Sequence, residues 1–262
     1  MTDVYKTQLD RQLLKCARTG DAEGVESLLA QGADPCQNNS EPLVSAANNG
    51  HAECVKLLIP VSDPKAKSSL ALRWASYNGH PECVKLLIPV SDPKAKSSLA
   101  LRWASYNGHP ECVKLLIPVS DPMAESSYAL RWAAENGHAD CVKLLIPVSD
   151  PKHNHRALQM AIDYANPDCA KLLIPASGPF LKRKKIRASV LSSGDADILS
   201  LMLAAEPLFL TGLDRPRCRD AVMARGHVEM AALLSSVIEQ ESLAAHIPGP
   251  EATNASAAPR RL

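Results

Sequence analysis

The strongest constraint on the fold is a block of 29 residues that repeats head to tail in the middle of the chain. The block at residues 61–89, VSDPKAKSSLALRWASYNGHPECVKLLIP, recurs without change at residues 90–118 and with a few substitutions at residues 119–147. Tandem units of this length stack on one another, and each buries its apolar face only against its neighbours. The sequence therefore predicts one elongated array in place of one or two ordinary globular domains.

Within one block the sequence predicts two short antiparallel helices joined by a tight turn. Ser68 and Ser69 are N-cap candidates for a first helix that ends near Asn78. Gly79 suits the left-handed position that closes a helix, and Pro81 suits the first turn of the second helix. Isolated helices shorter than roughly 12–15 residues are marginal in water, so the stacking of units must supply the stability.

The same pattern, less regular toward both ends, extends over most of the chain. We expect an all-α solenoid of about eight stacked helix-turn-helix units, followed by a disordered tail at residues 239–262 that is small and Pro-rich toward its end. The units are expected at residues 7–34, 41–63, 64–92, 93–121, 122–150, 151–178, 179–206 and 214–238.

The net charge and the distribution of apolar residues argue against some classes of binding partner. The net charge of +1 argues against broad binding to nucleic acid or to a membrane surface. The N-terminal residues MTDVYKTQLDRQ contain no apolar signal segment, and no stretch approaches 18 apolar residues. We therefore expect a cytoplasmic monomer that binds neither membrane nor nucleic acid.

Five of the eight cysteines recur at one position of the second helix. Stacked helices lie about 8–10 Å apart, whereas the Cα atoms of a disulfide are at most about 6.8 Å apart. These thiols are therefore expected to be small buried hydrophobes in a reducing compartment. They are Cys54, Cys83, Cys112, Cys141 and Cys169.

The residues of the block resemble the ankyrin repeat family. The resemblance rests on ALRWASYNGH at residues 71–80 with CVKLL at residues 83–87, and on Gly32-Ala33-Asp34 near the N-terminus. It covers roughly residues 7–238 and implies a curved stack of antiparallel helix pairs that binds other proteins and has no catalysis of its own. It also implies that the first helices line a concave groove.

Two departures from the family pattern bear on the loops. The period is 29 residues where the ankyrin unit typically has 33, and Leu70-Ala71-Leu72-Arg73 stands in place of the Thr-Pro-Leu-His signature. The missing residues fall between Asp92 and Leu101, where the family has its projecting hairpin. We therefore expect shortened loops between the units.

The sharpest functional signal lies on the first helix. With 100° per residue, small side chains share the packing face, while large aromatic side chains recur on the opposite face. We define the aromatic stripe as Trp74, Tyr77, Trp103, Tyr106 and Trp132, beside which run Arg73, Arg102 and Arg131. Tryptophan, tyrosine and arginine are enriched in interface hot spots, so we expect these eight residues to bind a protein or peptide. The alternative interpretation is that each indole packs on the next repeat with an arginine stacked on it.

Two further patterns have residue types that occur in binding sites. Histidine and cysteine recur three residues apart, as in His80 and Cys83, but units one repeat apart cannot bring four ligands together, so no metal site is expected. The basic run from Lys182 to Arg187 is either a solvated segment or a patch for nuclear import or an acidic partner.

No enzyme motif or cofactor motif appears in the sequence. We therefore expect a non-catalytic interaction scaffold without a cofactor. An enzyme or a regulatory arm of one would need a unique polar cluster, for which only the degenerate residues 180–219 have room. The near-identity of the repeats implies recent duplication, and the resemblance extends to bacterial effectors injected into host cells, which stays open as an alternative.

Overall fold

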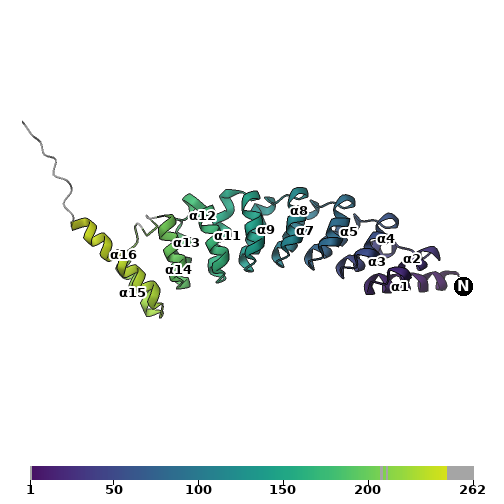
Figure 1. Ribbon diagram of the computed structural model, residues 1–262, viewed down its shortest axis with the longest axis horizontal. Coiled ribbons are helices and arrows are strands. Elements are labelled where there is room, and N and C mark those ends of the chain that lie inside the picture. The colour runs from purple at the N-terminus through teal and green to yellow at the C-terminus, as the bar shows by residue number, and fades with distance from the viewer. Residues whose placement is uncertain (1, 207–208, 211, 247–262) are drawn as a thin grey trace, which may run out of the picture.

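The computed structural model describes residues 2–206, 209–210 and 212–246, which form a long, gently arched row of helix pairs (Figure 1). Helix α1 lies at one end of the row and α16 at the other. The described residues contain helices and no strand, so the predicted all-α solenoid is confirmed. None of the helices in these segments has the length and apolar character to cross a membrane.

Each unit consists of a first helix, a tight turn and a second helix. The first helices are α1 (Thr2–Thr19), α3 (Gln37–Asn48), α5 (Ala66–Tyr77), α7 (Ala95–Tyr106), α9 (Ala124–Glu135), α11 (Pro151–Asp163), α13 (Lys184–Ser193) and α15 (Arg215–Ala224). The second helices are α2 (Ala22–Ala30), α4 (Ala52–Leu58), α6 (Pro81–Leu87), α8 (Pro110–Leu116), α10 (Ala139–Leu145), α12 (Pro167–Ser177), α14 (Ala196–Ala205) and α16 (Val228–His246). Single 3₁₀ turns follow five of the second helices: η1 (Ile59–Val61), η2 (Ile88–Val90), η3 (Ile117–Val119), η4 (Ile146–Val148) and η5 (Gly178–Phe180).

The last helix corrects the expected start of the tail. Helix α16 continues to His246, beyond residue 239 where disorder was expected to begin. The segment EQESLAA consists mainly of strong helix formers, which explains the extension. Residues 247–262 lie outside the described residues, so disorder there stays a prediction.

The core is one continuous layer between the first and second helices. In α5 the small face predicted from the sequence is buried, with Leu72, Ala75 and Ser76 at 0% exposure. Cys83, Val84 and Leu87 of α6 face them and are equally buried. The same positions are buried in the neighbouring copies, and one buried leucine contributes about 1.5–3 kcal/mol, so the stabilisation accumulates along the row.

The predicted N-caps are wrong, because the serines belong to a left-handed turn. Lys67, Ser68 and Ser69 have φ angles of 47–59°, so the right-handed helix starts only after them. Buried Ser69 does not cap its own helix; its Oγ accepts a hydrogen bond of 2.8 Å from the backbone N–H of Asp92, which lies in the loop between η2 and α7. The same bond recurs between Ser40 and Asp63, Ser98 and Asp121, and Ser127 and Asp150.

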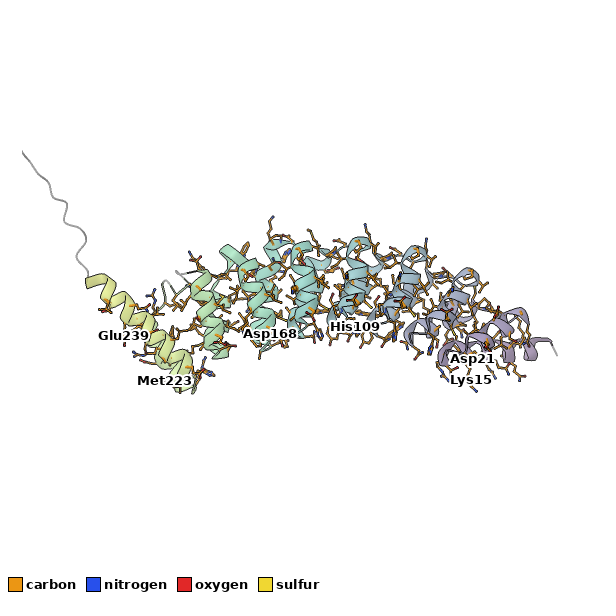
Figure 2. The ribbon with its side chains drawn as sticks, in the orientation of Figure 1. Lys15, Asp21, His109, Asp168, Met223 and Glu239 are labelled. Atoms are coloured by element: carbon orange, nitrogen blue, oxygen red, sulfur yellow. The ribbon has the colours of Figure 1, made fainter. Side chains whose placement is uncertain are left out.

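A second ladder runs along the turns between the two helices of each unit. Gly79 has a φ of +73°, and its missing side chain leaves room for the ring of His109 from the next unit. The Nε2 atom of His109 lies 2.9 Å from the carbonyl oxygen of Tyr77. Figure 2 shows His109 and Asp168 along the same edge of the row, where the units turn. Asn166 replaces histidine in α12's unit and donates from Nδ2 to the carbonyl oxygen of Glu135 at 2.7 Å.

The five cysteines that recur on the second helices are buried free thiols. Burial raises the pKa of Cys112 and of Cys141 to about 12, and the pKa of Cys83 and of Cys169 to about 11. Each thiol is therefore held protonated in the folded chain at a pH where an unfolded thiol ionises.

This difference predicts a loss of stability at alkaline pH. Because the ordinary thiol pKa of 9.0 is raised on folding, the folded state is favoured below pH 9 and loses stability between pH 9 and 12. From pH 8 to pH 10 each of these four thiols should lower the free energy of unfolding by about 1.4 kcal/mol. Urea unfolding at the two pH values measures this loss. Between pH 8 and pH 10 the free energy of unfolding of Cys112→Ala should fall by about 1.4 kcal/mol less than that of the wild type.

The matched control is Cys36→Ala, because the Cys36 thiol is exposed in the folded chain. This variant should retain the wild-type loss between pH 8 and pH 10. An identical pH dependence of Cys112→Ala and the wild type would contradict the assignment of the effect to the buried thiol.

Candidate functional site

The aromatic stripe lies where consecutive first helices pack side by side. Helices α5, α7 and α9 contact one another along the row and carry Trp74, Trp103 and Trp132 at equivalent positions. Each of these indoles is half-buried, and Tyr106 is 40% exposed. The stripe is therefore part of the packing and part of the surface.

The rings form two clusters along this face. Trp74 lies 5.4 Å from Tyr77 and 5.5 Å from Trp103, measured between ring centroids, and Tyr77 lies 5.4 Å from Trp103. Two of these three contacts are edge-to-face, the geometry that the ring quadrupoles favour. In the second cluster, Trp132 lies 5.3 Å from Tyr106.

Tyr128 joins the second cluster, although the sequence analysis did not include it among the site residues. Its ring centroid lies 4.7 Å from that of Trp132 in an edge-to-face contact. Its position in the repeat identifies it. Tyr128 lies ten residues before the turn histidine His138, and Leu70 lies ten residues before the equivalent His80. Leu70 lies one helical turn before Trp74, as Tyr128 lies before Trp132, so this column belongs to the same face as the tryptophans.

Two of the three arginines beside the stripe contact the next unit. The guanidinium of Arg73 lies 5.6 Å from the ring centroid of Trp103 in the next unit, and that of Arg102 lies 5.8 Å from Trp132. Arg73 is only 8% exposed, and its Nη2 donates to the carbonyl oxygen of Lys67 in the left-handed turn. Burial lowers the pKa of Arg73.

The Nη2 atom of Arg102 likewise donates to the carbonyl oxygen of Lys96 at 3.1 Å. The guanidinium of Arg131 instead lies 4.1 Å from the ring centroid of Tyr128 in its own unit. These contacts support the packing interpretation for Arg73 and Arg102. The rings of the stripe are less buried than Arg73, so part of this aromatic surface remains accessible to solvent.

A shallow hollow lies on the same face beside the first copy of the block. Its volume is about 250 Å³, and its lining includes Asn38 and Val44 of α3 together with Lys67 and Leu70 of α5. Leu70 extends the apolar character of the stripe toward the start of the helix. This face therefore combines apolar, aromatic and amide groups, as peptide-binding surfaces do.

The repeated histidines have a structural partner. His80 and His138, like His109, place Nε2 within 3.0 Å of a carbonyl oxygen in the preceding unit. Within the described segments, no three side chains of the His, Cys, Asp and Glu types gather in a way that would hold a metal ion. The basic run lies at the start of α13, where Lys182 pairs with Glu206 at 3.4 Å.

Comparison with known families agrees with this geometry. A model of ankyrin repeats, three copies long, matches residues 13–97 and residues 101–185, which together make up more than half of the chain. A search of curated proteins gives no match.

Proposed function

The chain belongs to the ankyrin repeat family, whose members generally bind other proteins, and on this premise we propose that it is a non-catalytic scaffold for a protein partner. An extended segment of that partner lies across the first helices α5, α7 and α9, over the aromatic stripe. The observation that carries the proposal is the half-exposed array of rings on consecutive helices.

The ring contacts favour binding as well as packing. A side chain that is already fixed by its neighbours loses little conformational freedom when a ligand covers it, so more of the contact energy remains as affinity. Tyr106 offers a ring that is held at 5.3 Å from Trp132 yet is 40% exposed. Such rigid, amphipathic rings are typical anchors of binding surfaces.

The proposal is tested by selecting peptides from a displayed random library on the wild-type protein. The affinities of the selected peptides are then measured for the double variant Tyr77→Ser/Tyr106→Ser. We expect a loss of about tenfold or more, because truncation of a hot-spot residue costs at least about 2 kcal/mol and tyrosine is enriched among hot spots. Circular dichroism verifies that the variant is folded.

The matched control is Lys85→Ser/Lys114→Ser, which changes exposed side chains on the second helices of the same two units. It should leave the affinities unchanged. Peptides that bind the tyrosine variant as tightly as the wild type, but lose affinity for the lysine variant, would place the binding surface on the second helices and overturn the proposal.

A further inference from the structure

A basic pocket lies further along the row, between α11 and the start of α13. Its volume is about 450 Å³. It is lined by His155, Arg156, Gln159, Arg183, Lys184 and Lys185. Four of these six side chains carry a fixed positive charge, and none is a carboxylate.

The pocket occupies the same face as the aromatic stripe. Arg156 stands ten residues before Asn166, which replaces the turn histidine, so Arg156 takes the position of Leu70 in α5. Lys185 stands 29 residues after Arg156 and holds the equivalent position in α13. The column that is apolar or aromatic in α5, α7 and α9 is thus basic in α11 and α13.

The wall of the pocket is held in place by ring stacking. Phe180 stacks on His155 with ring centroids 5.0 Å apart and an interplanar angle of 27°. The guanidinium of Arg183 lies 4.9 Å from the centroid of the same phenylalanine. These contacts fix the imidazole and one guanidinium at the pocket before any ligand arrives.

The positive charge in the pocket is not balanced from within. His155 is 6% exposed, and its buried Nδ1 atom has no hydrogen-bond partner among the residues that the structure describes. Burial lowers the pKa of His155 first, and the positive charge of Arg183 lowers it next. The positive field of the pocket therefore favours the neutral form of the imidazole, and a bound anion would offset that field.

The start of α13 adds a second source of positive potential. The helix runs for 10 residues from Lys184, and the side chain of Arg183, its N-cap residue, makes no hydrogen bond to the first turn. The first N–H groups of a helix have no partner within the helix and attract anions. This helix end is part of the pocket, because Arg183, Lys184 and Lys185 line it.

We propose that this pocket binds a phosphomonoester group. Two guanidinium groups match the bidentate geometry of phosphate oxygens, and two lysines add charge. A phosphomonoester dianion neutralises more of the four positive charges than a single carboxylate does. Two sources share this chemistry: a phosphorylated side chain of a protein, and a small free phosphate compound. The pocket is separate from the aromatic stripe, so the inference does not depend on the function proposed above.

The test is a ¹H–¹⁵N NMR titration of the full chain at constant ionic strength, with sodium chloride as reference. The probes are inorganic phosphate, a phosphoserine pentapeptide with glycine on both sides, and the same peptide without phosphate. We expect saturable shifts of the Lys184, Lys185 and Ile186 amides with phosphate or the phosphopeptide only. The variant Arg156→Ala/Lys185→Ala should weaken binding by about tenfold or more, since both positions are exposed and the fold should be retained.

The control variant Lys143→Ala/Lys171→Ala removes the same charge from exposed positions of α10 and α12 and should bind as the wild type does. Tighter binding of the phosphopeptide than of inorganic phosphate would assign the site to a phosphorylated protein, and the reverse order would assign it to a small phosphate compound. Shifts that match those in chloride, or an equal loss in both double variants, would overturn the proposal.

Discussion

Replacement of Gly50 by alanine is expected to lower the free energy of unfolding by about 3 kcal/mol. The residue has a φ of +78°, where an alanine costs roughly 1–2 kcal/mol. A Cβ atom at this site would also lie 2.6 Å from Nδ1 of His80 in the next unit. His80 is held by its contact with the carbonyl oxygen of Asn48 at 3.0 Å, so relief requires the units to separate, and overpacking adds about 1–3 kcal/mol.

The matched control for this prediction is Gly32→Ala. Gly32 has a φ of +90°, but no atom of the described residues lies within 4 Å of the added Cβ. Urea unfolding should therefore show a loss of only about 1–2 kcal/mol for this variant, the cost of the backbone alone. The double variant Gly50→Ala/His80→Ala should be less destabilised than the two single losses together, because the clash is absent. Equal losses for Gly32→Ala and Gly50→Ala would contradict the role of the glycine and histidine ladder.

Replacement of Trp103 by alanine is expected to cost about 3 kcal/mol as well. Trp103 is contacted by Trp74 at 5.5 Å, by Tyr77 at 5.4 Å and by the guanidinium of Arg73 at 5.6 Å. Each aromatic pair contributes about 0.5–1.5 kcal/mol beyond its buried area, and a partly desolvated cation over the ring adds about 1 kcal/mol. The measurement is urea unfolding followed by circular dichroism.

Trp103→Phe is the control, because it retains a ring for Tyr77 and Arg73 to contact. It should lose less stability than Trp103→Ala, because the smaller ring leaves a smaller cavity than the methyl group does. A loss below about 0.5 kcal/mol in Trp103→Ala would show that the indole serves only the surface, contrary to its half-buried position between two units.

Much of the fold could be predicted because the repeat itself fixes the helix boundaries. Gly79 and Pro81 mark the turn and the start of the second helix in the sequence, and the structure places them there. The buried face of Leu72 and Ala75 also follows directly from helical periodicity. These features depend on residues within one unit, which is what a sequence pattern records best.

The features that were not predicted depend on contacts between units. Ser69 looks like an N-cap locally, but its hydroxyl accepts a hydrogen bond from the backbone N–H of Asp92, 23 residues further along the chain in the loop that leads to the next first helix. Arg73 looks like an exposed interface residue, but it is buried between Lys67 and Trp103. Helical periodicity assigns a side chain to a face and gives no distance to the neighbouring copy, so the division of the stripe between packing and surface required the structure.

The most direct test of the proposed binding face is the fluorescence of the three tryptophans, all of which belong to the aromatic stripe. The measurement is acrylamide quenching of the wild-type protein, alone and saturated with a peptide selected from the library. A segment lying over α5, α7 and α9 should shift the emission to shorter wavelength and reduce the quenching. A saturating peptide that leaves both the emission and the quenching unchanged would place the partner elsewhere on the array.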